Sequence, residues 1–235
     1  TDPRFGKPTI TPFRVTLNEN NVPWRAGLTY KFDTGSLVYA NVSTGYKAGV
    51  MSGFSPATTL QYNPAKQEKL VAYEAGIKAP LLGGRVQFSG AGFYYQYSDK
   101  QVRARVSVPP FGLLERILNV PSSKIWGLEG AIFIQPVDGL NISLNGIYLN
   151  SKVSGSFIAY NQQGYLGDYK GSDLPYTPKL SAVGDVDYSF SVGDNMKAAL
   201  GGSLTYRGAT NTTFVTQTLL GSNFDLKSYA LLDMR

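Results

Sequence analysis

Residues 140–149 read L-N-I-S-L-N-G-I-Y-L, and this stretch decides the fold class. Apolar residues occupy alternate positions in it: Leu140, Ile142, Leu144 and Tyr148. Polar residues occupy positions between them: Asn141, Ser143 and Asn145. Successive side chains of a β-strand point to opposite faces, so this pattern predicts a strand with one apolar and one polar face. Such a strand lies between two different environments.

The same period of two recurs along the chain and predicts about nine strands. These cover residues 23–32, 36–49, 67–81, 85–103, 123–136, 140–153, 178–190, 195–208 and 225–235. Most of them are longer than the usual strand of about 5–6 residues. One stretch, Pro110–Asn119 (P-F-G-L-L-E-R-I-L-N), has helix-like spacing, and we interpret it as a short amphipathic turn inside a loop.

The connections between the predicted strands alternate between short and long. Short turns rich in Gly, Asp and Asn, which accept the positive φ of hairpins, lie at 33–35, 83–84, 137–139 and 193–195. Long connections rich in Gly, Pro, Ser, Asn and Gln cover 50–66, 104–122, 154–177 and 209–224. This alternation places the tight turns at one end of the sheet and the long loops at the other. It favours an all-β, antiparallel transmembrane barrel, with short periplasmic turns and long extracellular loops, over a soluble β-sandwich.

The amino-acid composition excludes several classes of function. Charged residues make up 16% of the 235 residues, below the roughly 25% of soluble domains. The net charge of +6 is dispersed along the chain, which argues against a nucleic-acid partner. The chain has no His and no Cys, which excludes disulfides, zinc ligation by these residues, a thiol nucleophile and an imidazole base. We therefore expect no enzyme activity, no metal site and no cofactor.

Five motifs then occur in a fixed order along the chain. They are Val22–Gly49, from V-P-W-R to G-Y-K-A-G; Tyr62–Pro64 with Tyr73–Lys78; Gly84–Val86 with Ala91–Tyr97 and Gln101–Val102; Ser123–Gly130 (S-K-I-W-G-L-E-G); and Leu174–Lys179 (L-P-Y-T-P-K). In this order they resemble the barrel of TonB-dependent outer-membrane receptors. The resemblance covers essentially all of residues 1–235.

The resemblance implies energy-coupled uptake of a scarce nutrient across the bacterial outer membrane. The substrate class it favours is a ferric siderophore, with other metal chelates or oligosaccharides left open. The partners it implies are the small-molecule substrate, a plug domain, the TonB complex, and the surrounding membrane lipid and lipopolysaccharide. A passive porin-like channel is the alternative, and a structural or adhesive barrel is a weaker one.

Two departures from the family pattern concern the extent of the chain. Neither a plug domain nor the short N-terminal box that engages TonB is visible, and the chain stops at Asp233-Met234-Arg235 without the family's final strand. We therefore expect residues 1–235 to be a partial barrel, with about nine of roughly 22 strands. Its edges would then need further strands, because an odd number of antiparallel strands cannot close.

Candidate substrate residues gather where a predicted strand meets a long loop. They are Arg103, Arg105, Tyr94, Tyr95, Tyr97 and, on the next strand, Trp126, with Lys100 and Gln101 beside them. Guanidinium and aromatic groups at a pore mouth suit an anionic, aromatic ferric siderophore. The alternative is an interfacial aromatic girdle whose basic neighbours contact lipopolysaccharide phosphates. Tyr30, Tyr188 and Phe190 would form the girdle at the turn end.

A second set of charged residues falls on the polar faces of the predicted strands. It comprises Glu74, Lys78, Arg85, Glu129, Asp185, Asp187, Lys197 and Arg207. We expect these side chains to face the lumen, where they could pair with one another or with the plug. A solvated, salt-bridged wall is the interpretation we favour. Asp185 and Asp187 resemble a catalytic carboxylate pair, but no cleft or partner motif accompanies them.

Overall fold

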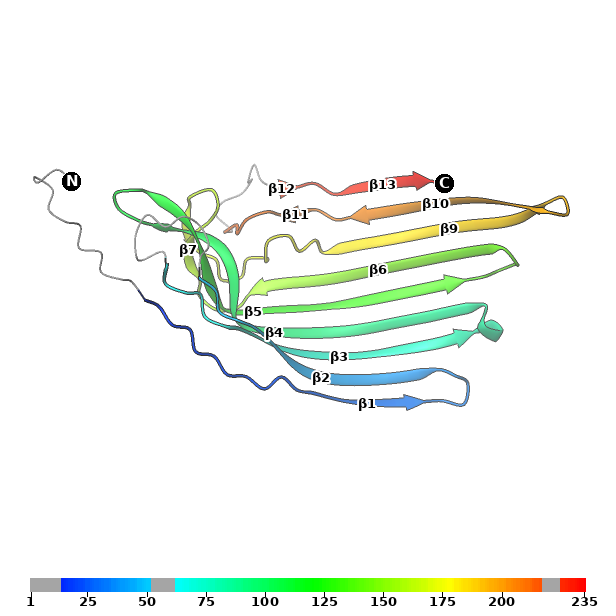
Figure 1. The fold of residues 1–235 in the computed structure, drawn as a ribbon, viewed down its shortest axis with the longest axis horizontal. Coiled ribbons are helices and arrows are strands. Elements are labelled where there is room, and N and C mark those ends of the chain that lie inside the picture. Colours follow the sequence, from blue (N-terminus) through cyan, green and yellow to red (C-terminus); the bar gives the residue numbers. More distant parts are fainter. Residues whose placement is uncertain (1–13, 52–61, 217–224) are drawn as a thin grey trace, which may run out of the picture.

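The computed structural model describes residues 14–51, 62–216 and 225–235, and its main feature is one antiparallel sheet. Nine strands form the main path of that sheet (Figure 1). They are β1 (Arg25–Lys31), β2 (Leu37–Lys47), β3 (Glu68–Leu81), β4 (Val86–Ser107), β5 (Leu113–Ile134), β6 (Leu140–Val153), β9 (Leu180–Val192), β10 (Met196–Arg207) and β13 (Tyr229–Met234). The predicted all-β antiparallel fold is thereby confirmed.

The strands lie side by side in chain order, so that each pairs with its neighbours in sequence. The tight turns gather at one end of the sheet and the long connections at the other (Figure 1). Glycines with positive φ close these turns: Gly35 at 83°, Gly139 at 83° and Gly193 at 67°. The short 3-10 turn η3 (Leu82–Gly84) closes the remaining one. The predicted segregation of turns and loops is confirmed.

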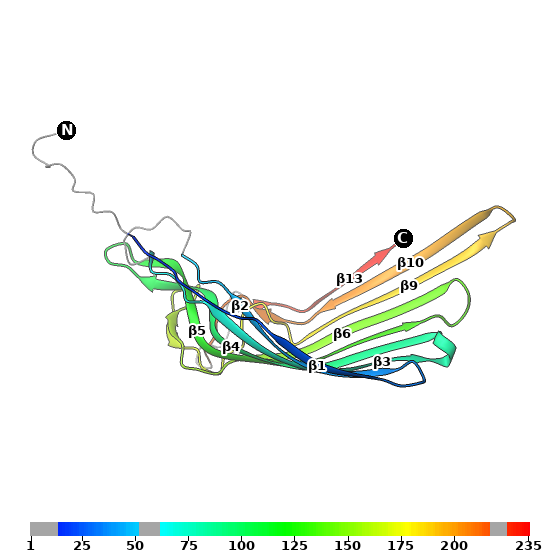
Figure 2. The same cartoon turned by 60° about the horizontal axis from the view of Figure 1, so that its bottom comes forward.

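The sheet is curved and open in this chain (Figure 2). Among the described residues, β1 pairs only with β2, and β13 pairs only with β10. Five strands have 11 to 14 residues: β2, β3, β6, β9 and β10. A transmembrane β-strand needs about 9–11 residues.

The described residues contain no helix long and apolar enough to cross a membrane.

The region between β4 and β5 departs from the sequence-based prediction. Residues 104–122 were expected to form a loop, but β4 and β5 each run for 22 residues and meet in a turn at 108–112. In that turn the Val108 amide donates to the Gly112 carbonyl at 2.7 Å. The amphipathic turn predicted at Pro110–Asn119 is wrong, because Leu113–Val120 pairs with Lys100–Ser107 in the sheet. A strand partner overrides the local helical spacing.

Other boundaries shift less. The predicted strand 225–235 divides into β12 (Asp225–Leu226) and β13. The predicted loops 50–66 and 209–224 lie partly outside the described residues, and residues 1–13 lie entirely outside them. The loop 154–177 contains a small hairpin, β7 (Ile158–Tyr160) and β8 (Leu166–Asp168), and β7 pairs with β4. β11 (Thr210–Asn211) pairs with β12.

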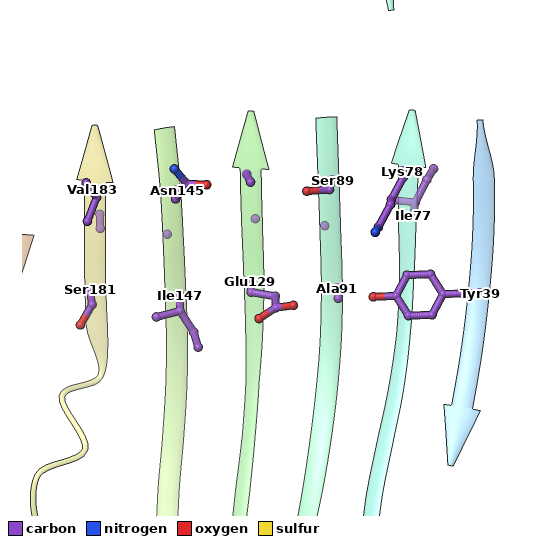
Figure 3. A pocket seen from close by; sticks show the side chains of 15 residues that line it. Tyr39, Ile77, Lys78, Ser89, Ala91, Glu129, Asn145, Ile147, Ser181 and Val183 are labelled. Carbon is purple, nitrogen blue, oxygen red and sulfur yellow. The ribbon is translucent and has the colours of Figure 1, made fainter. Parts of the chain in front are cut away.

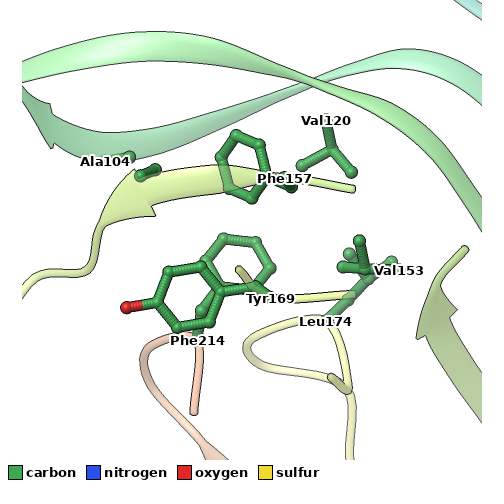
Figure 4. Packing of buried hydrophobic residues seen from close by; sticks show 8 residues of the cluster. Ala104, Val120, Val153, Phe157, Tyr169, Leu174 and Phe214 are labelled. Carbon is green, nitrogen blue, oxygen red and sulfur yellow. The ribbon is translucent and has the colours of Figure 1, made fainter. Parts of the chain in front are cut away.

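A hydrophobic core lies among the loops. Eight residues, each 5% exposed or less, form it: Ala104, Val120, Val153, Phe157, Ala159, Tyr169, Leu174 and Phe214 (Figure 4). We call this cluster the loop core. The Phe214 ring lies 5.4 Å from Phe157 and 5.5 Å from Tyr169, between ring centroids. We call the paired residues 100–107 of β4 and 113–120 of β5 the β4–β5 extension. The loop core therefore joins this extension to the connection after β6 and to the connection after β10, which are distant in sequence.

Candidate functional site

The strand register divides the long sheet into two chemically different faces. Apolar side chains such as Leu144, Val186 and Leu204 alternate with polar ones, and these three are about half exposed. They share one face, because Leu144 pairs with Gly184 and Leu204 pairs with the same glycine. We call this apolar face the outer face and the opposite one, which carries Glu74 and Glu129, the inner face. An exposed apolar face of this extent matches a lipid-facing surface.

The seven charged strand residues predicted to share a polar face do share the inner face. They are Glu74, Lys78, Glu129, Asp185, Asp187, Lys197 and Arg207. Cross-strand partners share a face, and so do residues two apart on one strand. Following these relations from β3 to β10 links all seven residues to one face. Arg85 lies just before β4, at the end of η3. Whether these residues face a lumen and contact a plug stays a prediction.

A hollow of about 550 Å³ lies on the inner face (Figure 3). Its lining includes Tyr39, Lys78, Ser89, Glu129, Asn145 and Ser181, which come from six neighbouring strands of the sheet. The ring of Tyr39 extends across β3 toward Glu129 and Ala91 in Figure 3. The hollow therefore lies on the inner face and mixes polar side chains with apolar ones such as Val183.

Tyr39 is fixed in this position by Glu74 and by a glycine. Its hydroxyl donates a hydrogen bond to Glu74 Oε1 at 2.8 Å. Its ring lies over Gly76, where an added Cβ would stand 2.7 Å from the ring. Sequence reasoning missed Tyr39, although it alternates with Asn41 and shares the polar face of its strand. Glu129 lies two strands from Glu74, so the inner face presents two carboxylates across β4.

The two aspartates of β9 have separate partners. Asp187 accepts hydrogen bonds from Arg235, with both carboxylate oxygens 2.8 Å from Nη2. This ion pair crosses Gly201, where an added Cβ would lie 2.3 Å from Asp187 Oδ1. Asp185 accepts a hydrogen bond from Ser143 at 3.1 Å. Neither aspartate contributes to a shared acid–base pair.

At the loop end, the inner face carries an aromatic and basic cluster. Tyr95 stacks on Phe93 with 4.8 Å between ring centroids. The Lys100 ammonium lies 4.0 Å from the centroid of the Tyr97 ring, a cation–π contact, and 3.5 Å from Glu68 Oε1. Because Lys100 and Tyr97 share a side, Lys100 belongs to the inner mouth of the sheet.

Asp99 separates the predicted substrate residues into two groups. It has φ of 53°, and neither it nor the opposite Pro121 takes part in the β4–β5 ladder. The alternation of side chains between the two faces shifts by one residue here. Tyr97 and Lys100 are three residues apart, and yet their side chains lie on the same side. Beyond this point Ala104 enters the loop core, so Arg103 and Arg105, its neighbours in sequence, face the other way.

Tyr94 and Trp126 also lie away from the inner face. The two are cross-strand partners, and they share the outer face with Leu128 and Tyr148. The structure therefore keeps Tyr95 and Tyr97 on the inner face and places Tyr94, Trp126, Arg103 and Arg105 apart from them. Their part in substrate binding stays a prediction.

Side-chain amides tie the connection after β2 to the β4–β5 extension. The Lys66 amide donates to Asn119 Oδ1 at 2.7 Å, and Asn119 Nδ2 donates back to the Lys66 carbonyl at 2.9 Å. Gln101 Nε2 donates to the Ala48 carbonyl at 2.7 Å. Both ends of this connection are therefore held beside the predicted substrate residues, a link that no local sequence signal indicates.

A second hollow, of about 670 Å³, lies in the loop layer. Its lining includes Lys152, Lys170, Asp168 and Asp173, and Lys152 Nζ pairs with Asp173 at 2.6 Å. Amide donors from Phe157 and Lys170 and the Ser156 hydroxyl hold the pKa of the Asp168 carboxyl below its usual range. Within the described ranges, no three acidic residues stand close enough to hold a metal ion.

Comparison with known proteins identifies the family. The model of the family described as "TonB dependent receptor-like, beta-barrel" matches residues 3–235. The chain belongs to this family. Members are receptors and transporters of the outer membrane rather than enzymes, and the open sheet of this chain corresponds to part of their barrel wall.

Relatives in the TonB-dependent receptor family include several named for siderophores. The ferrioxamine B receptor of Salmonella typhimurium is 26% identical over 222 residues, which make up 94% of this chain and 28% of that receptor. The ferric yersiniabactin uptake receptor FyuA from Yersinia pestis shares the fold, with a TM-score of 0.66 and 19% identity over 89% of this chain and 28% of FyuA. The siderophore receptor PiuA from Acinetobacter baumannii gives a TM-score of 0.62, with 21% identity and the same shares. The chain thus spans 28% of the length of each of these three relatives.

Proposed function

We propose that residues 1–235 form part of the barrel wall of an outer-membrane receptor that imports a ferric siderophore with energy from TonB. The observation that carries this proposal is the match to the ferrioxamine B receptor over 94% of the chain, together with the family match over residues 3–235. The division of the sheet into an apolar outer face and a charged inner face supports a membrane-embedded wall around a polar interior.

The inner face supports a second part of the proposal, which concerns the plug domain. Glu129 lines the 550 Å³ hollow, and Glu74, which accepts the hydrogen bond of Tyr39, lies on the same inner face. A plug surface that carries arginines would form charge-assisted hydrogen bonds with these carboxylates. The plug and the TonB box would then be supplied by segments other than residues 1–235.

The substrate residues that we propose lie at the loop end. Tyr95 and Tyr97 line the inner mouth with Lys100, and Arg103 and Arg105 stand on the adjoining extension of β4. Aromatic faces and cations suit an anionic chelate. Tyr94 and Trp126 share the outer face, so a girdle role at the membrane interface fits their position better than ligand stacking.

Uptake assays test the proposal directly. Cells that carry the full-length receptor should take up a radio-iron-labelled siderophore, and the uptake should cease when TonB is deleted. A passive porin-like channel, the alternative that the polar inner face permits, would continue to transport without TonB. The double change Arg103→Ala with Arg105→Ala should reduce uptake at an unchanged amount of receptor in the membrane, and unchanged uptake would remove both arginines from the substrate site.

A further inference from the structure

A buried glutamate lies behind the aromatic and basic cluster of the inner mouth. Glu68 begins β3, six residues before Glu74, so it shares the inner face, and it is 8% exposed. Beside it, Asp99 interrupts the β4–β5 ladder, and just past this point the Gln101 amide donates a hydrogen bond to Glu68 Oε2 at 2.8 Å. The pairing of β3 with β4 ends at Ser98, so this carboxylate oxygen replaces a strand carbonyl that β3 no longer provides.

The other oxygen of Glu68 faces Lys100. Lys100 Nζ lies 3.5 Å from Oε1, which is longer than the roughly 2.7–2.9 Å of a close charge-assisted hydrogen bond. The same ammonium lies 4.0 Å from the centroid of the Tyr97 ring. The Lys100 side chain is 24% exposed and that of Glu68 is 11% exposed. Glu68 is therefore fixed by a backbone amide, whereas Lys100 is held loosely and, with three N–H donors, can also reach a ligand in the mouth.

The negative charge of Glu68 is not needed for the bond to Gln101. A glutamine at position 68 would accept the same hydrogen bond, because its side-chain carbonyl is also an acceptor. Burying a charged group is costly unless it is paired, so the charge has its effect on the neighbouring cations. Lys100 is one of them, and Lys47, an exposed residue of β2, is the ladder partner of Glu68 on the other side. One carboxylate thus stands between two lysines of the inner face.

We propose that Glu68 is a specificity-determining residue, which limits the negative charge of the ferric chelates that the mouth accepts. It holds the Lys100 ammonium over the Tyr97 ring and offsets part of its charge. A weakly anionic chelate binds Lys100 beside the rings of Tyr95 and Tyr97, whereas a strongly anionic chelate is repelled by Glu68, because the repulsion grows with the charge of the ligand. The inference rests on the proposed function, since it concerns which members of the siderophore class are preferred.

Binding of two ferric chelates of different charge to the purified full-length receptor tests this role. The probes are a neutral ferric tris-hydroxamate and a strongly anionic ferric tris-catecholate, and binding is followed by quenching of tryptophan fluorescence at low salt. Glu68→Gln should bind the tris-catecholate about tenfold more tightly than the wild type does, and the tris-hydroxamate within about twofold, because only the charged chelate gains from the loss of a nearby negative charge. At about 1 M salt, which screens charges beyond roughly 3 Å, the gain should shrink.

The sign of the change separates this role from a structural one. Damage to the backbone around Gln101 would weaken the binding of both chelates, whereas the loss of a repulsive charge strengthens the binding of one. Lys100→Met should weaken the binding of the tris-catecholate and spare the tris-hydroxamate, which is the opposite of the effect of Glu68→Gln. The matched control, Asp138→Asn, removes one negative charge at the turn end and should leave both affinities unchanged.

The ratio of the two affinities decides the proposal. An unchanged ratio in Glu68→Gln would overturn it, as would weaker binding of both chelates or binding of neither chelate by any variant. Uptake of radio-iron by cells with and without TonB is measured separately. Failure of the proposed function would appear as TonB-independent uptake by the wild type, whereas an error confined to Glu68 would leave TonB-dependent uptake intact and the affinity ratio unaltered.

Discussion

Leu144 offers the sharpest test of the two-faced sheet. It lies on the outer face of β6, four residues from Tyr148, which contacts Trp126 toward the loop end, and four from Leu140, which pairs with Tyr188 at the turn end. Four residues correspond to about 13 Å along a strand. At a tilt of about 40° this becomes roughly 10 Å of depth on each side, so Leu144 lies near the middle of an apolar band about 25 Å tall.

Leu144→Arg should therefore destabilise the folded receptor by about 2–4 kcal/mol, the cost of an arginine at the bilayer midplane. The assay is urea unfolding of the full-length receptor in lipid vesicles, followed by tryptophan fluorescence. Asn145→Arg is the matched control, because Asn145 is adjacent in sequence but lines the inner hollow, and we expect little change. Leu140→Arg, near the interface, should cost about 0–1 kcal/mol. Equal costs at positions 144 and 145 would refute the assignment of the two faces.

Three other predictions concern the loops and turns. Phe214→Ala should lower the local stability of the loop core by about 3–5 kcal/mol, seen as faster hydrogen exchange at the Tyr169 amide with no change in the long strands. Gly193→Ala should cost about 1–2 kcal/mol because φ is 67° with open space around it, whereas Gly139→Ala should cost more, because its Cβ would lie 2.1 Å from the Ser189 carbonyl oxygen; equal unfolding midpoints would contradict this. Because hydrogen bonds lower the pKa of Asp168, its contribution to loop order should be complete above about pH 4 and lost as the pH falls through the lowered pKa, and hydrogen exchange in Asp168→Asn should lack this dependence.

The sequence was sufficient to predict the long strands and their turns because both have local causes. Alternation in residues such as Leu140 to Tyr148 reflects the two environments of each strand, and glycines such as Gly35 mark positive φ. The shared face of Glu74 and Glu129 followed from the same alternation. These features require no knowledge of distant partners.

Features that depend on distant contacts were beyond the sequence pattern. Leu113–Val120 has helix-like spacing, and only its pairing with Lys100–Ser107 makes it a strand. The shift at Asp99 places Lys100 on the inner face and the two arginines on the opposite side. The sequence does not predict it, because an aspartate in an extended segment does not indicate a positive φ. The loop core brings together Phe157 and Phe214 from separate connections, which no local pattern can indicate.

The order of the strands has a consequence for how the wall is assembled. Each long strand pairs with its nearest neighbours in the chain, and the longest connection between paired strands joins β6 to β9, residues 153 to 180. Closing a loop becomes only slowly more costly as its length grows, and short sequence separations favour rapid formation. The sheet can therefore grow as a zipper, one hairpin at a time, with each finished hairpin offering a paired template to the next. In such a scheme the loop core forms only after β10 has been added, because Phe214 follows that strand.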